Sequence, residues 1–201
     1  LSSTNSNGGT NNVVLSDVSG TVALGSGALS GATGAALVVN NSSATVSYAG
    51  SITSTTQGVM LTSNTGTISL SGVLALNTFT NAAVTATGGG TVQATNTGNT
   101  LSSTTATALN ITDTTIGSGG LRFRRIDSNG GSTAGIVLSN TRPLGGLSVL
   151  GDGSAGSGGT IQGKAASCIS VSNSRDLHLA SMVLQNCQTH GLDASNLTHF
   201  S

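Results

Sequence analysis

A six-residue pattern recurs along this chain and limits what it can fold into. The pattern is a small residue, an apolar residue, any residue, a second apolar residue, any residue and asparagine; its clearest copies are Gly135–Asn140, Cys168–Asn173 and Gly191–Asn196. Weaker copies begin at positions 58, 83 and 108, so the first apolar residues stand at 59, 84, 109, 136, 169 and 192. The intervals are 25, 25, 27, 33 and 23 residues. A repeat of this length is typical of a solenoid whose coils each hold three short strands.

Apolar residues alternate with polar ones in short runs, which favours β-strands over helices. Gly, Ser, Thr and Asn fill 108 of the 201 positions, a composition that also occurs in flexible linkers, but 36% of the residues are hydrophobic and they lie in ordered runs. Glu is absent and Lys occurs once, so strong helix formers are scarce. We therefore expect an all-β chain with strands at 21–24, 45–48, 67–70, 91–94, 121–123 and 147–150.

These features together predict a parallel β-solenoid of about seven or eight coils of roughly 23–33 residues, and the resemblance described below implies that it is a right-handed parallel β-helix. Stacked coils lie about 4.8 Å apart, so each coil buries its inward side chains against equivalent residues above and below. No Pro-rich or acidic break interrupts the pattern, so we expect residues 1–201 to form one continuous domain. The chain begins without a polar cap and ends at Phe200 and Ser201 in the middle of a coil, which suggests an excerpt of a longer chain or an uncapped assembly unit.

Asparagine at one repeated turn position predicts a structural ladder. Asn tolerates left-handed backbone angles and can pass amide hydrogen bonds from one coil to the next. The recurring pattern places Asn140, Asn173 and Asn196 in such a ladder. Asn77, Asn129 and Asn186 precede the next copy of the pattern by six or seven residues, with Gln162 as their equivalent in the remaining coil, and predict a second ladder.

The second half of the chain resembles a known class of repeats. The segments Gly135–Thr141, Gly145–Gln162, Cys168–Asn186 and His190–Leu192 are similar to the right-handed β-helix repeats of large bacterial secreted and surface proteins, which are distantly related to the pectate-lyase-like superfamily. The resemblance is strong from about Leu101 to Ser201 and compositional before it. The resemblance implies export and an extended adhesive or scaffold-like shaft. Repeats of this type occur in proteins of unrelated function, so they indicate the fold more specifically than the function.

Charge and composition argue against several partners. Lys and Arg number six, Asp and Glu number six, and the net charge is zero, so the chain has no excess charge to attract nucleic acid or an anionic membrane. Aromatic residues make up 2%, too few for base-stacking platforms, and no apolar run is long enough to span a bilayer. The expected partners are further β-helix coils of the same or neighbouring chains, with a host or matrix glycan left open.

Two cysteines and a basic strand are the main candidate sites. In the repeat register Cys168 and Cys187 lie on one turn region of adjacent coils, so a disulfide and two buried free thiols both remain open. Cys187 and His190 have a metal-compatible spacing, but two further ligands are not evident, and we expect no metal or cofactor. Arg122 and Arg124 point outward from one strand and could contact an acidic glycan or only solubilise the surface.

The acidic residues argue against an enzyme. Glycosidases and lyases need clustered carboxylates, whereas the aspartates of this chain fall at different coil positions. The register places His199 above Asp176, which imitates a general-base pair but is interpreted as a surface contact. Asp152 lies in a glycine-rich insertion without phosphate-binding or calcium-binding partners. The outward row at positions 60, 85, 110, 137, 170 and 193 is irregular, which argues against ice binding.

The sequence thus leads to three functional hypotheses. The first is a non-enzymatic extracellular structural or adhesive shaft of a bacterial surface or secreted protein. The second is a self-assembling extracellular fibre subunit that stacks end to end. The third is a β-helix that binds or degrades polysaccharide, with a cleft that involves Arg122, Arg124 and the loop at 151–159.

Overall fold

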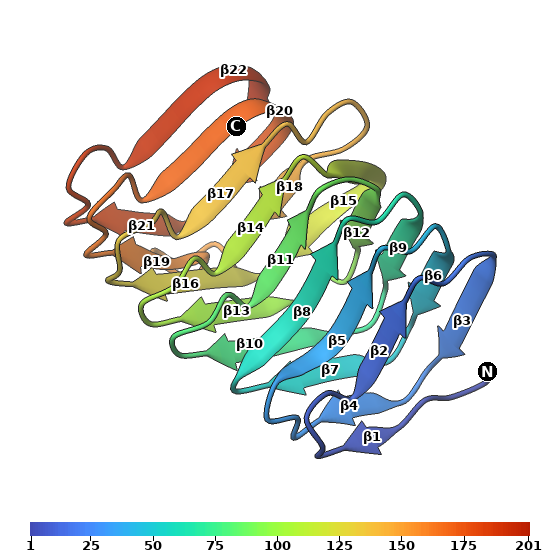
Figure 1. Ribbon diagram of the computed structural model, residues 1–201. Helices are drawn as coiled ribbons and strands as arrows, with labels where there is room; N and C mark the ends of the chain where they lie inside the picture. The colour runs from blue at the N-terminus through green and yellow to red at the C-terminus, as the bar shows by residue number, and fades with distance from the viewer.

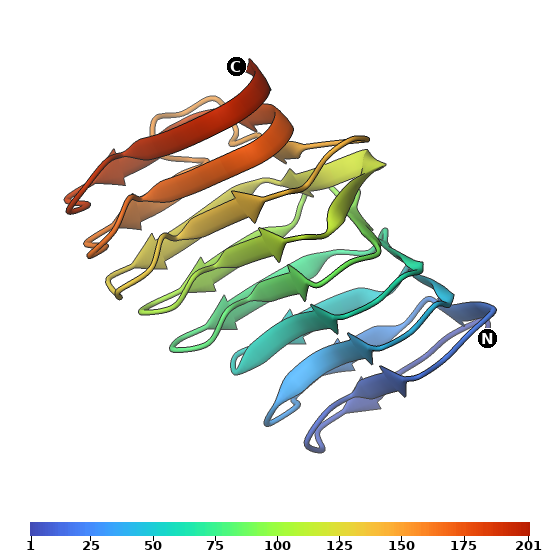
Figure 2. The same cartoon turned by 45° about the horizontal axis from the view of Figure 1, so that its top comes forward.

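The computed structural model describes all 201 residues as a parallel β-solenoid of eight coils (Figure 1). Every named strand pair is parallel, and the chain contains no helix and therefore none that is long and apolar enough to cross a membrane. Figure 2 shows the coils stacked along one axis, with the N-terminus at one end and the C-terminus at the other. The predicted all-β parallel solenoid is confirmed.

Three faces run along the solenoid. Sheet 1 has one strand from each coil, and these strands are β1 (Ser6–Asn7), β4 (Ala28–Ser30), β7 (Ser51–Ser54), β10 (Leu74–Thr78), β13 (Thr100–Ser103), β16 (Arg125–Asn129), β19 (Gly159–Gln162) and β21 (Met182–Gln185). Sheet 2 contains β2 (Val13–Ser16), β5 (Ala35–Asn40), β8 (Gln57–Thr62), β11 (Val84–Thr87), β14 (Leu109–Thr112), β17 (Ile136–Ser139), the first part of β20 (Ile169–Leu179) and β22 (Leu192–Phe200).

Sheet 3 forms the remaining face and is continuous with sheet 2 through β20 and, in the last coil, β22. Its strands are β3 (Thr21–Gly25), β6 (Thr45–Tyr48), β9 (Thr67–Leu70), β12 (Thr91–Ala94), β15 (Thr115–Phe123) and β18 (Leu147–Val149). The long strand β20 pairs with β17 at its beginning and with β18 at its end, so it bends across the corner between sheets 2 and 3.

The six-residue pattern marks the true register of sheet 2. Val59 pairs with Val84, and the row continues through Leu109, Ile136, Ile169 and Leu192, as the spacing predicts. The structure extends this row toward the N-terminus, where Val13 pairs with Leu37 and Leu37 with Val59. The first two coils therefore share a register that the sequence pattern does not reveal.

Inward residues of the three faces form one continuous core of 37 buried residues. The interior is aliphatic, with Tyr48 and Phe123 as the largest fully buried side chains. The residue before the first inward residue of each sheet 2 strand is Gly, Ala or Cys in every coil but the first, where it is Asn12. At Gly58 the corner is tight, since an added Cβ would lie 2.2 Å from the carbonyl oxygen of Ala83. Gly135 is similarly crowded, since an added Cβ would lie 2.6 Å from Cγ2 of Ile161. Glycine at these two copies of the pattern is therefore a steric requirement of the corner.

Extra residues are accommodated outside the stack. The longest coil contains the loop around Pro143 and the glycine-rich insertion that begins at Gly151, both between strands. Between β12 and β15 the register jumps, because Val92 pairs with Ile116 whereas Ala94 pairs with Leu121. The four residues at 117–120 bulge outward, and sheet 3 keeps its inward and outward alternation on both sides of the bulge.

Candidate functional sites

The corner between sheets 2 and 3 carries the ladder predicted for Asn140, Asn173 and Asn196. All three residues have positive φ, between 46° and 54°. Nδ2 of Asn173 donates to Oδ1 of Asn140 at 2.8 Å, and Nδ2 of Asn196 donates to Oδ1 of Asn173 at 2.5 Å. The chain of amides ends where Nδ2 of Asn140 donates to Oδ1 of Asp113 at 2.6 Å.

The same corner is left-handed in every coil. The position is filled by Asp17, Asn41, Ser63, Gly88, Asp113, Asn140, Asn173 and Asn196, and φ lies between 46° and 78° at all eight. Asp, Asn and Gly are the residues that adopt this conformation at least cost, and Ser63 is the exception. The pattern showed asparagine at this position only in the last three coils. Other residues replace it at positions 17, 63, 88 and 113, and Asn41 lies in a coil where the pattern was not recognised.

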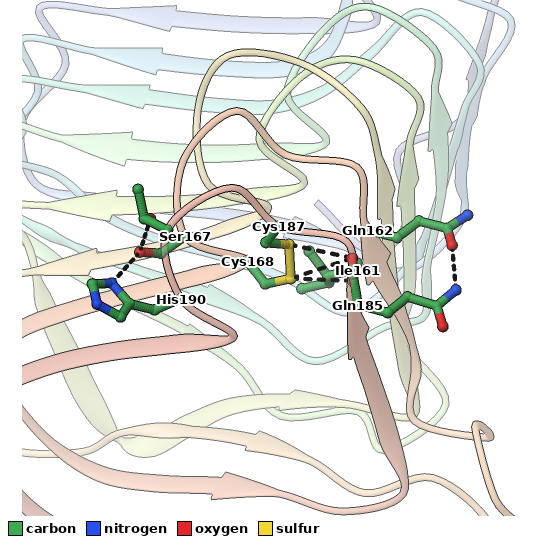
Figure 3. The surroundings of a disulfide bond; sticks show 8 residues. Ile161, Gln162, Ser167, Cys168, Gln185, Cys187 and His190 are labelled. Carbon is green, nitrogen blue, oxygen red and sulfur yellow. Dashed lines mark hydrogen bonds between the residues drawn. A yellow bond between two sulfur atoms is a disulfide. The ribbon is translucent and has the colours of Figure 1, made fainter.

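The second predicted ladder is wrong. Asn77 pairs with Ser102, whereas Asn129 pairs with Gln162, two positions further along the strand. Asn186 directly follows Gln185, the residue that pairs with Gln162. The prediction counted residues back from the next copy of the pattern, and the turn in between varies in length. The equivalence of Asn129 with Gln162 is the part that holds, and the amide contact on this face joins Gln185 to Gln162 (Figure 3).

The two cysteines are joined. Cys168 and Cys187 form a disulfide with their Cα atoms 5.4 Å apart (Figure 3). Cys168 occupies the small corner position ahead of Ile169, and Cys187 lies on the turn that follows β21. The backbone N–H of Cys168 donates to the carbonyl of His190, so the bridge and this hydrogen bond hold the last turn to the coil before it. Both thiols are used in the bridge, which leaves Cys187 without a thiolate for a metal.

The predicted glycan contacts Arg122 and Arg124 are both exposed, but they do not lie on one strand as predicted, because β15 ends at Phe123 and Arg124 lies in the bend before β16. Arg122 lies in an outward row of sheet 3 with Ser148 and His178 as its neighbours in the following coils. Neither Arg122 nor Arg124 forms an ion pair, whereas Arg125 binds Asp127 with Nη2 2.8 Å from Oδ1. The structure therefore places both guanidinium groups where a ligand could reach them.

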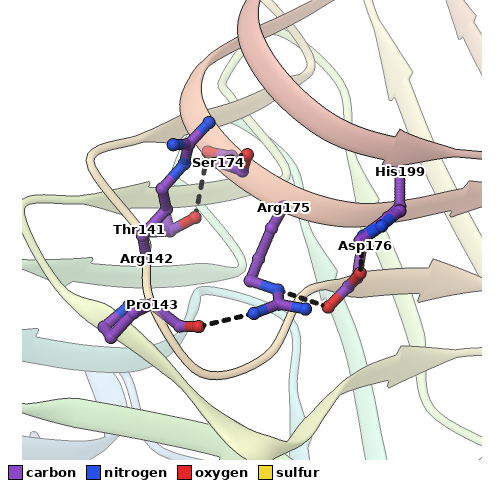
Figure 4. A network of polar contacts seen from close by, with 7 residues as sticks. All are labelled: Thr141, Arg142, Pro143, Ser174, Arg175, Asp176 and His199. Atoms are coloured by element: carbon purple, nitrogen blue, oxygen red, sulfur yellow. Dashed lines mark hydrogen bonds and ion pairs between the residues drawn. The ribbon is translucent and has the colours of Figure 1, made fainter.

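His199 lies above Asp176 as predicted, in a network that ties neighbouring coils together (Figure 4). Nδ1 of His199 is 2.9 Å from Oδ1 of Asp176, and Nε of Arg175 donates to Oδ2 at 2.6 Å. The bond from Arg175 holds the pKa of the Asp176 carboxyl below its usual value. Nη1 of Arg175 also donates to the carbonyl of Pro143 at 2.9 Å.

Arg142 makes the matching contacts from the loop side of this network. Its Nε donates to the carbonyl of Ser174 at 3.2 Å, and its Nη2 donates to Oδ1 of Asn196 at 3.0 Å. Thr141 donates to the hydroxyl of Ser174 at 2.9 Å, as Figure 4 shows. The arginines thus fasten the loop around Pro143 to the two following coils, and the arrangement is a structural clamp.

The glycine-rich insertion is closed on itself. Oδ1 of Asp152 accepts bonds from the backbone N–H of Ser154 at 3.0 Å and from its hydroxyl. These bonds lower the pKa of Asp152 to about 2. The hydroxyl of Ser157 donates to the carbonyl of Ser154 and accepts from the N–H of Asp152. The carboxylate of Asp152 is therefore hydrogen-bonded within its own loop.

A buried lysine is a feature that the sequence analysis missed. Lys164 is 1% exposed, and its Nζ donates to the carbonyl of Ala106 at 3.1 Å. The same carbonyl accepts the hydroxyls of Ser103 at 2.6 Å and Ser128 at 2.8 Å. Burial lowers the pKa of Lys164 to about 8. Its place in a turn gave no sequence signal, because lysine in a turn is normally solvated.

An open groove lies beside sheet 2 at the C-terminal end of the solenoid. Its volume is about 500 Å³. The floor includes Val137, Ser170 and Asp193, which are consecutive members of one outward row. The wall is formed by the turns that precede β17, β20 and β22 and contains Thr133, Ser167 and Thr189. The outward row was predicted from the sequence, but the wall was not, because the turns that form it carry no repeated pattern.

The groove wall is held by hydrogen bonds between hydroxyl groups. Oγ of Ser167 is 2.8 Å from Oγ1 of Thr189 and 3.4 Å from Nδ1 of His190 (Figure 3). One coil earlier, Oγ1 of Thr133 is 2.9 Å from Oγ1 of Thr107. The disulfide lies directly behind this wall, since Cys168 follows Ser167 in the chain.

Comparison with known proteins adds no assignment to this geometry. No protein-family model, curated protein or solved structure matches the chain. The structure itself shows that the chain is a parallel β-solenoid of about eight coils, stabilised by one aliphatic core and closed at its last turn by a disulfide.

Proposed function

We propose that the chain is a non-enzymatic structural and adhesive β-helix shaft of a bacterial surface or secreted protein. The observation that carries this proposal is the unbroken register of sheet 2, in which eight strands pair in sequence from Val13 to Leu192. At about 4.8 Å per coil these strands form a straight rod with hydrogen bonds directed along its axis. Such a rod suits a spacer that holds a binding surface away from a cell.

The disulfide supports the extracellular location. Disulfides persist in oxidising compartments and are rare where glutathione and thioredoxin keep thiols reduced. The bridge between Cys168 and Cys187 closes the last turn, at the end of the solenoid where the coils are least buried. Ser, Thr and Asn provide a neutral hydrated surface in place of charge.

The test is to locate the protein on the cells that produce it and to determine its thiol state. Antibodies against residues 1–201 should label intact cells or the culture medium, and alkylation with mass spectrometry should find no free thiol before reduction. A protein confined to the cell interior with both cysteines alkylated would overturn the proposal.

End-to-end stacking of coils is the second proposal, and the exposed strand edge supports it. β22 pairs with β20 alone, and its apolar residues are uncovered on the other side: Leu197 is half-buried and Phe200 is 58% exposed. Further coils from the same or a neighbouring chain would cover this edge. Sedimentation at increasing concentration should show filaments that Phe200→Asp prevents, and a monomer at all concentrations would contradict stacking by this segment.

Binding of an acidic polysaccharide is the third proposal, and the exposed guanidinium groups of Arg122 and Arg124 support it. Both are exposed and neither forms an ion pair. A panel of sulfated and uronic-acid glycans should show binding or turnover that the double variant Arg122→Ala, Arg124→Ala loses. No signal across the panel would remove this proposal.

A further inference from the structure

The groove beside sheet 2 combines three kinds of chemical group. Ser170 on the floor and Thr133 and Thr189 on the wall supply hydroxyl groups. Val137 and three alanines supply aliphatic surface. Asp193 is the single charged residue among the ten that line the groove, and it forms no ion pair. The volume of about 500 Å³ lies within the usual range for sites that bind small molecules.

The floor of the groove is rigid. Ile136, Ile169 and Leu192, the inward neighbours of its three floor residues, belong to the continuous row of sheet 2. Successive floor residues are about 4.8 Å apart, so about 10 Å separates Val137 from Asp193. The groove therefore presents an aliphatic group, a hydroxyl and a carboxylate in line along the solenoid axis.

The wall is fixed on the opposite side. The hydroxyl contact between Ser167 and Thr189 joins the last two turns, and the disulfide behind it joins the same two segments covalently. A ligand would therefore meet a site whose two sides are already ordered, which reduces the entropy lost on binding.

We propose that this groove binds an amino sugar. The ammonium group would pair with the carboxylate of Asp193, the ring hydroxyls would bond to Ser170 and the wall threonines, and the C–H face of the ring would pack on Val137 and the alanines. This proposal deepens the adhesive part of the proposed function, rests on it, and names the class of ligand.

Other ligand classes match the groove less well. A uronic acid would bring its carboxylate toward Asp193, and like charges repel. An N-acetylated sugar carries no ammonium group for Asp193. A simple alkyl ammonium would satisfy the carboxylate but has no further polar groups to bond to the hydroxyls, and a lysine peptide has no ring hydroxyls to match their spacing. The groove and the basic patch at Arg122 and Arg124 therefore select sugars of opposite charge.

Calorimetric titration with a β-1,4-linked glucosamine trimer tests the proposal. We expect binding that weakens with salt, and about a fivefold loss of affinity in Asp193→Asn, because Asp193 is exposed and its pairing is screened by water. Ser170→Ile keeps a strand-forming residue but fills the floor, and it should abolish binding. The N-acetylated trimer should bind more weakly and a galacturonic acid trimer should not bind.

Matched variants outside the groove provide the controls. Asp17→Asn removes the same charge at a left-handed corner that asparagine accepts, and Ser148→Ile makes the same change on the outer face of sheet 3. Neither should alter the affinity. Circular dichroism and the urea midpoint of each variant establish that the solenoid is folded.

Three results would overturn the amino-sugar proposal. They are no binding of the glucosamine trimer to the folded protein, binding that survives both Asp193→Asn and Ser170→Ile, or a trilysine peptide that binds as tightly as the glucosamine trimer. The last result would identify a plain cation site. Surface labelling of cells is an independent measurement, so a failed titration with positive labelling would reject the ligand and retain the shaft.

Discussion

Asn173 is the residue at which the energetics of the corner ladder can be separated into two parts. Its φ of 46° places it in the left-handed region. Its side chain donates to Asn140 at 2.8 Å and accepts from Asn196 at 2.5 Å. Asn173→Ala would remove both hydrogen bonds and introduce a residue that adopts this backbone conformation at greater cost. Asn173→Gly would remove the same hydrogen bonds while keeping the conformation accessible.

The structure sets the expected magnitudes. A left-handed conformation costs an L-residue about 1–2 kcal/mol, part of which asparagine already bears, so we take about 1 kcal/mol for alanine over asparagine. The two hydrogen bonds lie on an exposed corner and belong at the low end of the usual range, about 0.5 kcal/mol each. We therefore expect Asn173→Ala to lower the free energy of unfolding by about 2 kcal/mol and Asn173→Gly by about 1 kcal/mol.

Urea unfolding followed by circular dichroism measures these differences. The slope of the free energy of unfolding against urea concentration should be the same in all variants. A shift of the unfolding midpoint then measures a change in stability. Ser195→Ala, an exposed change in the last coil, is the control and should fall within about 0.5 kcal/mol of the parent. If Asn173→Ala and Asn173→Gly are equally destabilising, the left-handed backbone conformation adds no cost for alanine. If Asn173→Ala has no effect, the ladder does not stabilise the solenoid, and our reasoning is refuted.

Three further predictions concern the bridge, the buried lysine and the core. The Cys168→Ala, Cys187→Ala double variant should lose about 3 kcal/mol in chemical unfolding, the loop entropy expected for the sequence separation of 19; an unchanged midpoint would count against this. Lys164 has a folded pKa of about 8 against 10.5 unfolded, so the folded state binds fewer protons between these values and stability should rise with pH there. Lys164→Met should remove that rise, which thermal unfolding of the variant and the parent across this pH range would measure. If the stability of both proteins changes with pH in the same way, Lys164 does not cause the rise. Leu109→Ala should cost about 2–5 kcal/mol, whereas its outward neighbour Asn110→Ala should cost under about 1; equal midpoints would show that position 109 is not in the core.

Much of the architecture was accessible from the sequence because a stacked solenoid repeats its own constraints. Every coil must place apolar residues on the same inward positions, so the rows through Val59 and Leu192 appear as a periodic pattern. The left-handed corner restricts residue type as well, which made Asn140, Asn173 and Asn196 visible. In the first coils Asp17 and Ser63 occupy the same corner with the same left-handed backbone. The asparagine pattern is therefore not visible there in the sequence.

The second ladder shows which registers a repeat pattern does not predict. Asn77 and Asn129 stand at similar distances from the next copy of the pattern, yet they lie two positions apart in sheet 1. Turn lengths differ between coils, and a turn on the surface has no buried neighbour that would fix its length. The register between strands of one sheet could therefore be predicted. The register of the next sheet could not be predicted from it, because the turn between them varies in length.

The sequence by itself determined the fold class, the period and the left-handed corner, because each follows from a constraint that recurs in every coil. Tertiary structure decided the features that involve residues from different turns. The disulfide depends on the distance between two turns. The pKa of Lys164 depends on its burial by neighbouring coils. The groove depends on the position of three turns relative to the outward row that ends at Asp193. These features are set by three-dimensional proximity, and no periodic pattern along the chain encodes them.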